Sequence, residues 1–306
     1  MKVLVATEKP FAAVAVEGIR REIEDAGYTL ALLEKYTDRA QLLEAVADAD
    51  ALIVRSDKID AEVIDAARQL KIIVRAGAGY DNIDLEAASA RGIVVENTPG
   101  QNSNAVAELV FGLAVMAVRN MYNGTSGTEL RGKRLGIHAF GQVGRNVARI
   151  ARGFQMNISA LDPYCPDEVM LEASVQPLHD VKVLYAGNDV VSLHIPATAE
   201  TRGSVGYELI TSMPKNGVLI NTARKEVIDE EGLDKALAER IDIKYVADIR
   251  PGNADALMEK YPGRVFFTPK KMGAQTAEAN INAGIAAARQ TVAYLRDGID
   301  RFRVNR

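Results

Sequence analysis

The chain has 306 residues, of which 48% are hydrophobic, and 37 basic against 41 acidic side chains give a formal net charge of −4. At about 150 residues per domain, this length predicts two folded domains, and the absence of a like-charge block disfavours a nucleic-acid-binding protein. A single cysteine, Cys165, excludes a disulfide-stapled secreted domain and a cysteine zinc cluster. The longest apolar stretch, 105–118, is interrupted by Glu108 and is shorter than the roughly 18 residues of a membrane span. We therefore expect a cytoplasmic protein with no membrane or nucleic-acid partner and no metal site.

Short β-branched runs alternate with longer amphipathic stretches along the chain. Continuous apolar runs are typical of strands buried on both faces, and their alternation with helices predicts parallel sheets. Ten such strands exceed one ordinary sheet, so the sequence predicts an α/β protein with two doubly wound parallel-sheet domains. The predicted strands are 3–5, 51–54, 72–74, 93–95, 135–137, 158–160, 190–193, 218–220, 245–247 and 265–267.

Two long helices indicate where the chain changes domain. A turn-rich octet, 97–104, precedes a predicted helix over 105–119, and a last helix over 277–297 follows the last strand. Because this last helix comes after both sets of strands, we expect the chain to return to the first domain, which is then discontinuous. The predicted domains are 1–100 together with 277–306, and 101–276.

The last helix carries signals at both ends. Thr276 is a suitable N-terminal cap, and Gly298 is a suitable C-terminal cap. Apolar side chains recur along one predicted buried face. These are Ile281, Ile285, Ala288, Val292 and Leu295.

The clearest binding motif is A-F-G-Q-V-G at 139–144, between a strand and a helix. It is the dinucleotide-binding turn with its first glycine replaced by Ala139. Gly141 allows the backbone to approach a pyrophosphate, Gly144 allows close packing of helix and strand, and the helix N-terminus offers free amides. A turn that binds no ligand is the alternative.

An acidic residue strengthens the cofactor interpretation. Asp162 ends the next strand, 18 residues after Gly144, where a carboxylate binds ribose hydroxyls. Because a carboxylate there repels a 2′-phosphate, the sequence predicts NAD rather than NADP. The cofactor contacts predicted from this part of the chain are Phe140, Gly141, Gln142, Val143, Gly144, Asp162, Pro163 and Tyr164.

Further motifs carry a family resemblance. They are R-A-G-A-G-Y-D-N-I-D at 75–84, N-T-P-G-Q-N-S at 97–103, S-L-H-I-P-A-T-A-E-T-R-G at 192–203 and N-T-A-R at 221–224. In this order they resemble the D-isomer-specific 2-hydroxyacid dehydrogenases, and within that family the short D-3-phosphoglycerate dehydrogenases that lack a regulatory domain. The resemblance implies a flavodoxin-like substrate domain, a Rossmann NAD-binding domain and a homodimer.

The resemblance also implies residue roles. Arg224 matches the arginine that binds the substrate's carboxylate and carbonyl, and the amides of Gly77, Ala78 and Gly79 match those that cradle the carboxylate. Asp248 matches an acid near the nicotinamide amide, although a capping aspartate is the alternative. His194 matches a position beside the cofactor ribose, where we expect a packed, non-reacting histidine. The remaining cofactor contacts that the resemblance implies are Pro196, Thr201, Thr222, Ala223, Arg224, Gly273 and Ala274.

The chain departs from the family pattern at its acid and base. The family usually has a histidine in T-P-H-x-G and a glutamate in D-V-F-x-x-E-P, whereas this chain has T-P-K-K-M-G at 268–273 and D-I-R-P-G-N at 248–253. Neither His138 nor His179 lies at the expected position in the pattern. The loss of both groups leaves open a non-catalytic NAD(H)-sensing protein.

A lysine can replace the histidine, because an ammonium can donate a proton to the ketone. We expect burial beside Arg224 to lower the pKa of this lysine. Counting back from the start of the last helix selects Lys271, which we favour, and counting forward from Pro269 selects Lys270. A lysine pair that only neutralises cofactor phosphates is the alternative.

A phosphate site is the last prediction. Arg55 and Ser56 follow the strand 51–54 and could bind a distal anion together with Asn102, although the neighbouring Asp57 weakens the case. We interpret the nearby Lys58 as a solvated charge. The expected reaction is NAD-dependent oxidation of D-3-phosphoglycerate to 3-phosphohydroxypyruvate, at the start of serine synthesis. Reduction of glyoxylate or hydroxypyruvate is the alternative that needs no phosphate site.

Overall fold

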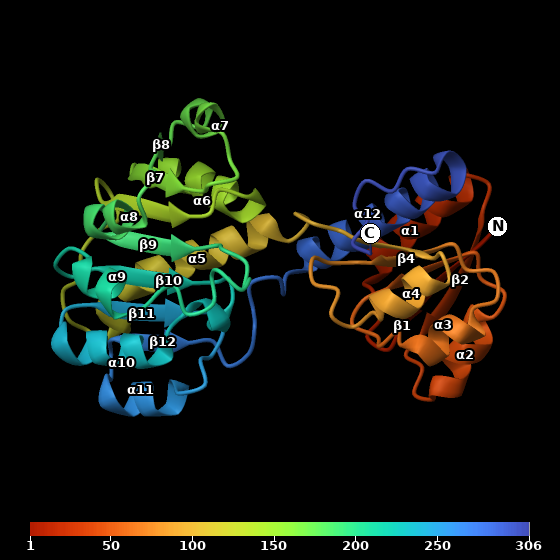
Figure 1. Cartoon of the computed structure of the whole chain (residues 1–306), viewed down its shortest axis with the longest axis horizontal. Helices are drawn as coiled ribbons and strands as arrows, with labels where there is room; N and C mark the ends of the chain where they lie inside the picture. Colours follow the sequence, from red (N-terminus) through yellow and green to blue (C-terminus); the bar gives the residue numbers. More distant parts are fainter. Residues whose placement is uncertain (306) are drawn as a thin grey trace. The chain divides into compact units, whose positions relative to one another are not determined.

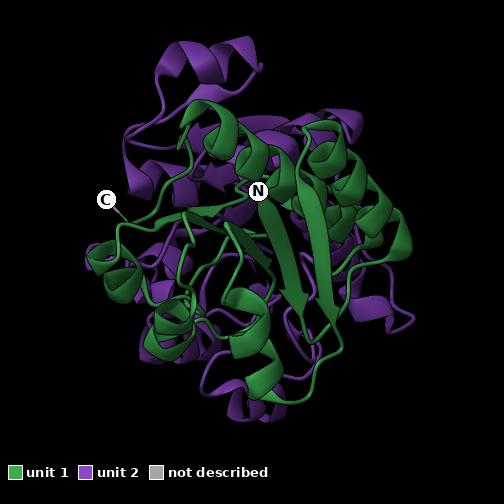
Figure 2. Cartoon of the chain, turned by 90° about the vertical axis from the view of Figure 1, so that its right-hand side faces the viewer, with its two compact units in different colours: residues 1–102, 275–306 green, residues 103–274 purple. Residues whose placement is uncertain are grey.

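The computed structural model describes residues 1–305 and divides into two compact units. Unit 1 comprises Met1–Asn102 and the residues from Gln275 onward, and unit 2 comprises Ser103–Ala274 (Figure 2). Unit 1 is therefore discontinuous, and both boundaries lie two residues from the positions that the sequence indicated.

Unit 1 contains a five-stranded parallel sheet in the order β2-β1-β3-β4-β5 (Figure 1). This is the flavodoxin-type order, with β1 and β3 at the topological switch point. The helices α1 and α12 bury their apolar residues against one face, and α2, α3 and α4 cover the other. The strands are β1 Lys2–Thr7, β2 Thr29–Glu34, β3 Ala51–Val54, β4 Ile72–Arg75 and β5 Val94–Asn97. The helices are α1 Ala13–Asp25, α2 Arg39–Val46, α3 Ala61–Ala66, α4 Leu85–Ala90 and α12 Ala277–Asp297.

Unit 2 contains a seven-stranded parallel sheet in the order β12-β11-β10-β9-β6-β7-β8. The strand order reverses between β6 and β9, and in such sheets ligands bind outside the carboxyl ends of the strands at this point. The strands are β6 Arg134–His138, β7 Asn157–Leu161, β8 Gln176–Pro177, β9 Val190–Leu193, β10 Val218–Asn221, β11 Lys244–Ala247 and β12 Val265–Phe267. The helices are α5 Ser103–Val118, α6 Gln142–Gly153, α7 Asp167–Glu172, α8 Val181–Gly187, α9 Tyr207–Ser212, α10 Glu230–Glu239 and α11 Ala254–Lys260, with 3₁₀ turns η1 Asn120–Tyr122 and η2 Lys225–Val227.

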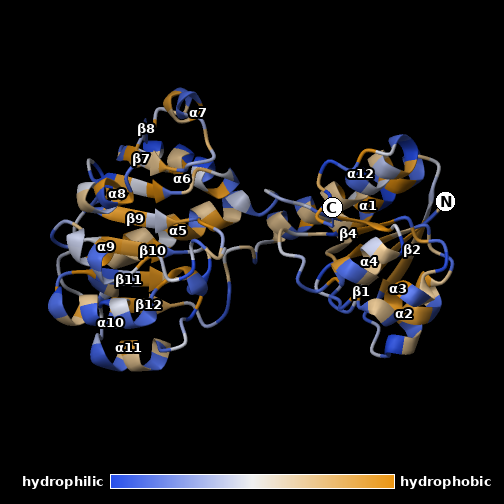
Figure 3. Cartoon of the chain, viewed as in Figure 1, coloured by the Kyte–Doolittle hydropathy of each residue, from blue (hydrophilic) through white to orange (hydrophobic). Residues whose placement is uncertain are grey.

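The predicted class of two doubly wound parallel sheets is confirmed, and each predicted strand overlaps an observed one. Central strands such as β3, β9 and β10 are buried along their whole length, and Figure 3 shows the strands of both units largely in the hydrophobic colours. The sequence analysis missed β2 and the two-residue β8. β2 is an edge strand that is only partly buried, and its sequence, T-L-A-L-L-E, is rich in residues that favour helices.

The caps predicted for α12 are confirmed, but its buried face is only partly the predicted one. Thr276 Oγ1 accepts a hydrogen bond of 3.1 Å from the Ala279 amide, and Gly298 adopts a φ of 67°. The buried face consists mainly of small residues, because a Cβ on Gly284 would lie 3.0 Å from the Phe11 ring and 3.1 Å from Ile19. The larger side chains, such as Ile281, are only partly buried at the edge of the contact with α1. Within residues 1–305, no helix combines the length and hydropathy that a membrane span requires.

Candidate active site

The turn at 139–144 joins β6 to α6 at the carboxyl edge of the unit 2 sheet, beside the switch point. Ala139 adopts a φ of 83°, a conformation that glycine accommodates without strain. A Cβ on Gly144 would lie 2.4 Å from the Ala139 carbonyl oxygen, so the turn requires glycine there. By contrast, a Cβ on Gly141 would meet no described atom within 4 Å. No side chain of residues 1–305 caps α6, so its first amides face an open side that fits a dinucleotide phosphate.

The carboxylate of Asp162 fastens this turn to the end of β7. Its Oδ2 accepts a hydrogen bond from the Phe140 amide at 2.8 Å, and its Oδ1 accepts one from the Tyr164 amide at 2.9 Å. Each carboxylate oxygen has two acceptor positions, so both oxygens can also accept a hydrogen bond from a ribose hydroxyl. Pro163 and Tyr164 are exposed beside it. The structure thus brings together the dinucleotide residues selected from the sequence.

The two histidines at this edge are neutral. His138 Nδ1 lies 3.2 Å from the Tyr185 hydroxyl, and His194 Nε2 lies 3.0 Å from the Ser192 hydroxyl. Burial lowers the pKa of His138 to about 4 and the pKa of His194 to about 3. Neither ring is therefore an imidazolium near pH 7, in line with the packed histidine expected at position 194.

Two neighbouring loops are ordered by their own side chains. The Thr201 hydroxyl donates to the Pro196 carbonyl at 2.5 Å and accepts from the Thr198 amide at 2.8 Å, which fixes the loop after β9. In the N-T-A-R segment, the buried Asn221 donates to the Arg224 carbonyl at 2.9 Å. Sequence reasoning missed this role of Asn221.

The Arg224 side chain is exposed, and its Nη1 donates to the Ala223 carbonyl at 2.9 Å. Thr222, on the same segment, has a buried hydroxyl with no hydrogen-bond partner among residues 1–305. The remaining donors of the Arg224 guanidinium can bind a carboxylate, for which its planar fork is suited.

Asp248 anchors the segment that carries the two candidate lysines. It is 1% exposed, and its Oδ1 accepts hydrogen bonds from the Met272 amide at 2.7 Å and the Thr268 hydroxyl at 3.0 Å. Its Oδ2 accepts from the Gly273 amide at 2.8 Å. Asp248 is therefore an anchor of this segment rather than the helix-capping aspartate considered as the alternative, and its contact with a nicotinamide amide stays a prediction.

Lys270 and Lys271 are both exposed within unit 2, as is Arg224. The burial that we expected to lower the pKa of the lysine is therefore not provided by this unit. The 268–273 segment is held through the amides of Met272 and Gly273, which donate to Asp248, and both lysines belong to the exposed part of this segment.

In unit 1, the guanidinium of Arg55 donates to three neutral oxygens among the described residues. Its Nη1 donates to the carbonyls of Lys9 at 2.9 Å and Pro10 at 3.0 Å, and its Nη2 donates to Asn280 Oδ1 at 2.8 Å. The guanidinium also stacks over the Phe11 ring at 5.2 Å. Burial lowers the pKa of Arg55, so its positive charge is partly desolvated.

Asp57, the acid that weakened the sequence case for this site, is buried beside Arg55: its Oδ2 accepts a hydrogen bond from the Arg55 backbone amide at 3.3 Å, and its charge acts to raise the pKa of Arg55. Asp57 is 4% exposed and accepts hydrogen bonds from the Glu8 amide at 2.7 Å and the Tyr36 hydroxyl at 2.9 Å. Ser56 is exposed, and Lys58 is exposed and pairs with Asp60 at 3.5 Å, which agrees with its interpretation as a solvated charge.

Sequence reasoning missed a second arginine, Arg75, at the end of β4. Its guanidinium occupies the space where a side chain on Gly77 would begin, since a Cβ there would lie 1.4 Å from Arg75 Nη1. Burial and the nearby charge of Arg55 lower the pKa of Arg75, and its Nε has no hydrogen-bond partner among the described residues. The sequence did contain a signal for Arg75, because it is a charged residue at the end of the otherwise apolar strand β4. Two of the predicted carboxylate-binding residues, Ala78 and Gly79, follow this strand and are at least partly exposed. Asn102, predicted to help bind the phosphate, ends the first segment of unit 1 and is partly exposed.

The model of the family described as D-isomer specific 2-hydroxyacid dehydrogenase, catalytic domain, matches residues 10–305. The chain belongs to this family. It is 39% identical over 289 residues to a D-3-phosphoglycerate dehydrogenase of Methanocaldococcus jannaschii, which covers 87% of this chain and 54% of that protein. It is 36% identical over 278 residues to a hydroxypyruvate reductase of Thermotoga maritima, which covers 84% of this chain and 88% of that protein.

A solved member of the family has the same fold over the whole chain. The NAD⁺-bound 3-phosphoglycerate dehydrogenase of Entamoeba histolytica is 47% identical, with a TM-score of 0.85 over 100% of this chain and 99% of that one. The chain spans about half the length of the archaeal D-3-phosphoglycerate dehydrogenases that it matches.

Proposed function

We propose that this member of the family is an NAD-dependent dehydrogenase that oxidises D-3-phosphoglycerate to 3-phosphohydroxypyruvate. The observation that carries the substrate assignment is the pair Arg55 and Arg75. Both guanidinium groups are partly desolvated, and neither forms an ion pair within 4 Å among residues 1–305, although the charges of Asp57 and Asp81 lie near enough to act toward raising the pKa of Arg55 and of Arg75. Two cations without a paired acid suit a doubly charged phosphate group. The names of the relatives in Methanocaldococcus jannaschii and Entamoeba histolytica support the same substrate.

The cofactor assignment rests on the open side of Gly141, the uncapped start of α6 and the carboxylate of Asp162. When bound there, NAD accepts a hydride from the carbon that carries the substrate's hydroxyl. The Asp162 carboxylate accepts hydrogen bonds from the ribose diol and repels a 2′-phosphate. Equal kcat/KM values for NAD and NADP would contradict this role.

We assign the proton transfer to Lys271. In the oxidation direction its neutral amine accepts the hydroxyl proton, and in reduction its ammonium returns it. Asp248 binds the amides of Met272 and Gly273, so the backbone next to Lys271 is held more closely than that of Lys270. Arg224 binds the substrate's carboxylate and carbonyl oxygens. We do not assign this role to His138 or His194, because burial lowers their pKa values to about 4 and about 3, which makes them weak bases in oxidation and leaves no imidazolium to donate a proton in reduction.

The substrate is tested by Arg55→Ala. We expect the KM for D-3-phosphoglycerate to rise about 10- to 100-fold, because a charge-assisted contact contributes roughly 1.5–3 kcal/mol, and the KM for D-glycerate to change little. Lys58→Ala removes a neighbouring exposed charge and is the matched control. If both KM values rose equally, the phosphate assignment would be lost. Reduction of hydroxypyruvate or glyoxylate, named for relatives in Thermotoga maritima and Thermococcus litoralis, would then be the better assignment.

The mechanism is tested by Lys271→Ala. We expect kcat to fall by about 10² to 10⁴, with NADH affinity nearly unchanged, because general acid catalysis contributes this factor. Lys270→Ala is the matched control and should lower kcat much less. Lys271→Arg keeps the charge but cannot titrate in this range, so restored activity would mean that the residue is only an electrostatic anchor. Cofactor binding without turnover on any 2-hydroxyacid would favour a non-catalytic NAD(H)-binding protein.

We also propose a homodimer, as the family resemblance implies. Sedimentation should then give a species of twice the 33.1 kDa chain mass. A single species at the chain mass would refute this assembly.

A further inference from the structure

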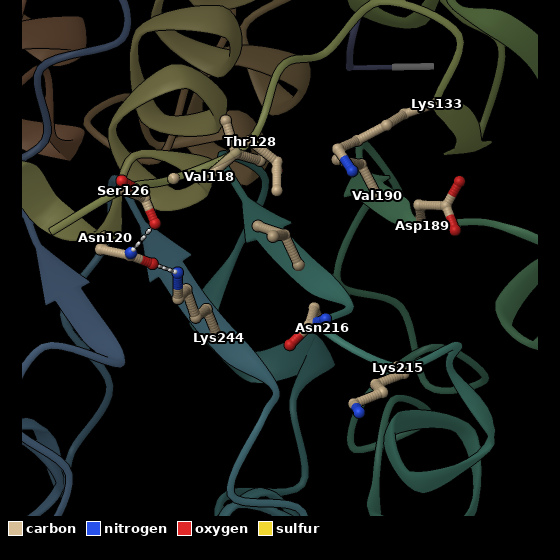
Figure 4. A pocket seen from close by; sticks show the side chains of 12 residues that line it. Val118, Asn120, Ser126, Thr128, Lys133, Asp189, Val190, Lys215, Asn216 and Lys244 are labelled. Carbon is tan, nitrogen blue, oxygen red and sulfur yellow. Dashed lines mark hydrogen bonds between the residues drawn. The ribbon is translucent and has the colours of Figure 1, made fainter.

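A pocket separate from the predicted cofactor residues lies at the opposite edge of the unit 2 sheet. Its volume is about 290 Å³, and residues just before or at the start of β6, β9, β10 and β11 line it (Figure 4). The five-residue strand β6 separates the two edges by about 16 Å, at roughly 3.3 Å per residue. A ligand in this pocket therefore does not share the turn at 139–144.

Three lysines from three separate segments line this pocket. They are Lys133 before β6, Lys215 before β10 and Lys244 at the start of β11 (Figure 4). Neither Lys133 nor Lys215 has a carboxylate within 4 Å in the described part of the chain. Lys244 Nζ donates to the Ala117 carbonyl at 2.7 Å and to Asn120 Oδ1 at 2.6 Å, and both acceptors are neutral. Burial lowers the pKa of Lys244, so water solvates its charge poorly.

The nearest acids are already neutralised by arginines. Asp189, the one acid among the lining residues, accepts from Arg134 Nη2 at 2.7 Å and Nε at 3.2 Å, although Lys133 also contributes to lowering the pKa of Asp189. Asp242, which accepts from the Asn216 amide, is paired with Arg240 at 2.9 Å. The pocket consequently keeps an excess of positive charge.

One wall of the pocket is a strained and well-braced loop. Asn120, Met121 and Tyr122 adopt successive φ values of 53°, 54° and 56°. Non-glycine residues in this region cost about 1 kcal/mol or more each, and such strain concentrates at functional sites. The side-chain amide of Asn120 stabilises the loop, because its Nδ2 donates hydrogen bonds to Thr125 Oγ1 at 2.9 Å and to the Ser126 carbonyl at 3.0 Å.

We propose that this pocket binds a small anion that carries a phosphate group, as inorganic phosphate or as the phosphate ester of a small metabolite. Lysine ammonium groups bind phosphate as point charges. Neutral donors among the lining residues are the hydroxyls of Ser126 and Thr128 and the side-chain amide of Asn216. The volume is close to the lower limit for small-molecule sites, which fits an anion of this size. This site is independent of the function proposed above.

The test is calorimetric titration of the full chain with inorganic phosphate, at constant ionic strength and with saturating NAD⁺. An Arg55→Ala background weakens the other proposed phosphate site, so that binding at this pocket can be measured separately. We expect one site per chain, and about a hundredfold weaker binding after Lys133→Ala with Lys215→Ala, since each charge-assisted contact contributes roughly tenfold. Lys182→Ala, an exposed lysine on α8, is the matched control and should leave the affinity unchanged.

Unchanged affinity in the double variant, or no binding by the Arg55→Ala chain, would overturn the proposal. A second titration with glycerol 3-phosphate, a phosphate ester that lacks the carboxylate we propose Arg224 binds, distinguishes the two ligand sources, because tighter binding than inorganic phosphate would identify a phosphate ester. In the otherwise native chain, the double variant should retain the wild-type kcat, so failure here leaves the proposed dehydrogenase activity untouched.

Discussion

The two glycines of the turn at 139–144 should respond in opposite ways to alanine. In Gly144→Ala, the new Cβ would lie 2.4 Å from the Ala139 carbonyl oxygen and 3.1 Å from Ile137 Cγ2. Because the closer atom belongs to the backbone, the turn must move, and overpacking of this kind costs about 1–3 kcal/mol. For a unit of this size, we expect a Tm lower by roughly 2–10 °C.

Gly141→Ala should instead leave stability within about 0.5 kcal/mol of the wild type, because its Cβ meets no described atom within 4 Å and its φ of −74° suits any residue. The methyl group would, however, occupy the open side where we place the pyrophosphate. We expect NADH affinity to fall about tenfold or more. Scanning calorimetry measures the first effect, and NADH fluorescence titration measures the second.

The two readouts separate the structural role from the binding role. If Gly141→Ala destabilised the protein as much as Gly144→Ala, the open side inferred at Gly141 would be wrong. If Gly141→Ala bound NADH as the wild type does, this turn would not be the dinucleotide site.

Three further measurements follow from single side chains. Ala139→Gly should raise the unfolding free energy by about 1 kcal/mol in thermal denaturation, because it relieves a φ of 83°, and a decrease would refute the strain. The pKa of His138 is about 4 when folded, against about 6.5 when unfolded, so the unfolded chain binds a proton first as the pH falls. The unfolding free energy should thus drop by the order of 3 kcal/mol between pH 6.5 and 4. The drop should be smaller in His138→Gln and unchanged in the control His179→Gln, and the same pH dependence in His138→Gln and the wild type would contradict this. In Asp248→Asn, one of the two oxygens that accept from the Met272 and Gly273 amides becomes a donor, so kcat should fall about tenfold with NADH affinity retained. An unchanged kcat would show that the 268–273 segment needs no such anchor.

The sequence by itself determined the fold class and the family, and it predicted the dinucleotide turn. These features have local signatures: β-branched runs mark strands buried on both faces, and glycine at 141 and 144 with an acid at 162 predicts a phosphate and ribose site. The caps of α12, Thr276 and Gly298, were equally readable, because a cap depends on hydrogen bonds within one turn.

Tertiary structure decided features that depend on distant segments. β2 was missed because its pairing with β1, rather than its composition, makes it a strand. The small residues of α12 are buried because α1 packs closely against them. Neither fact is encoded in the periodicity of one element.

The same reason applies to the charged groups. Asp57 faces inward because Tyr36 and the Glu8 amide bind it, and Asp248 anchors a segment 24 residues farther along the chain. Arg75 became a candidate only when its guanidinium was found across Gly77 and near Arg55. A motif shows which charges are present, but their burial, direction and pairing depend on neighbours that only the folded chain brings together.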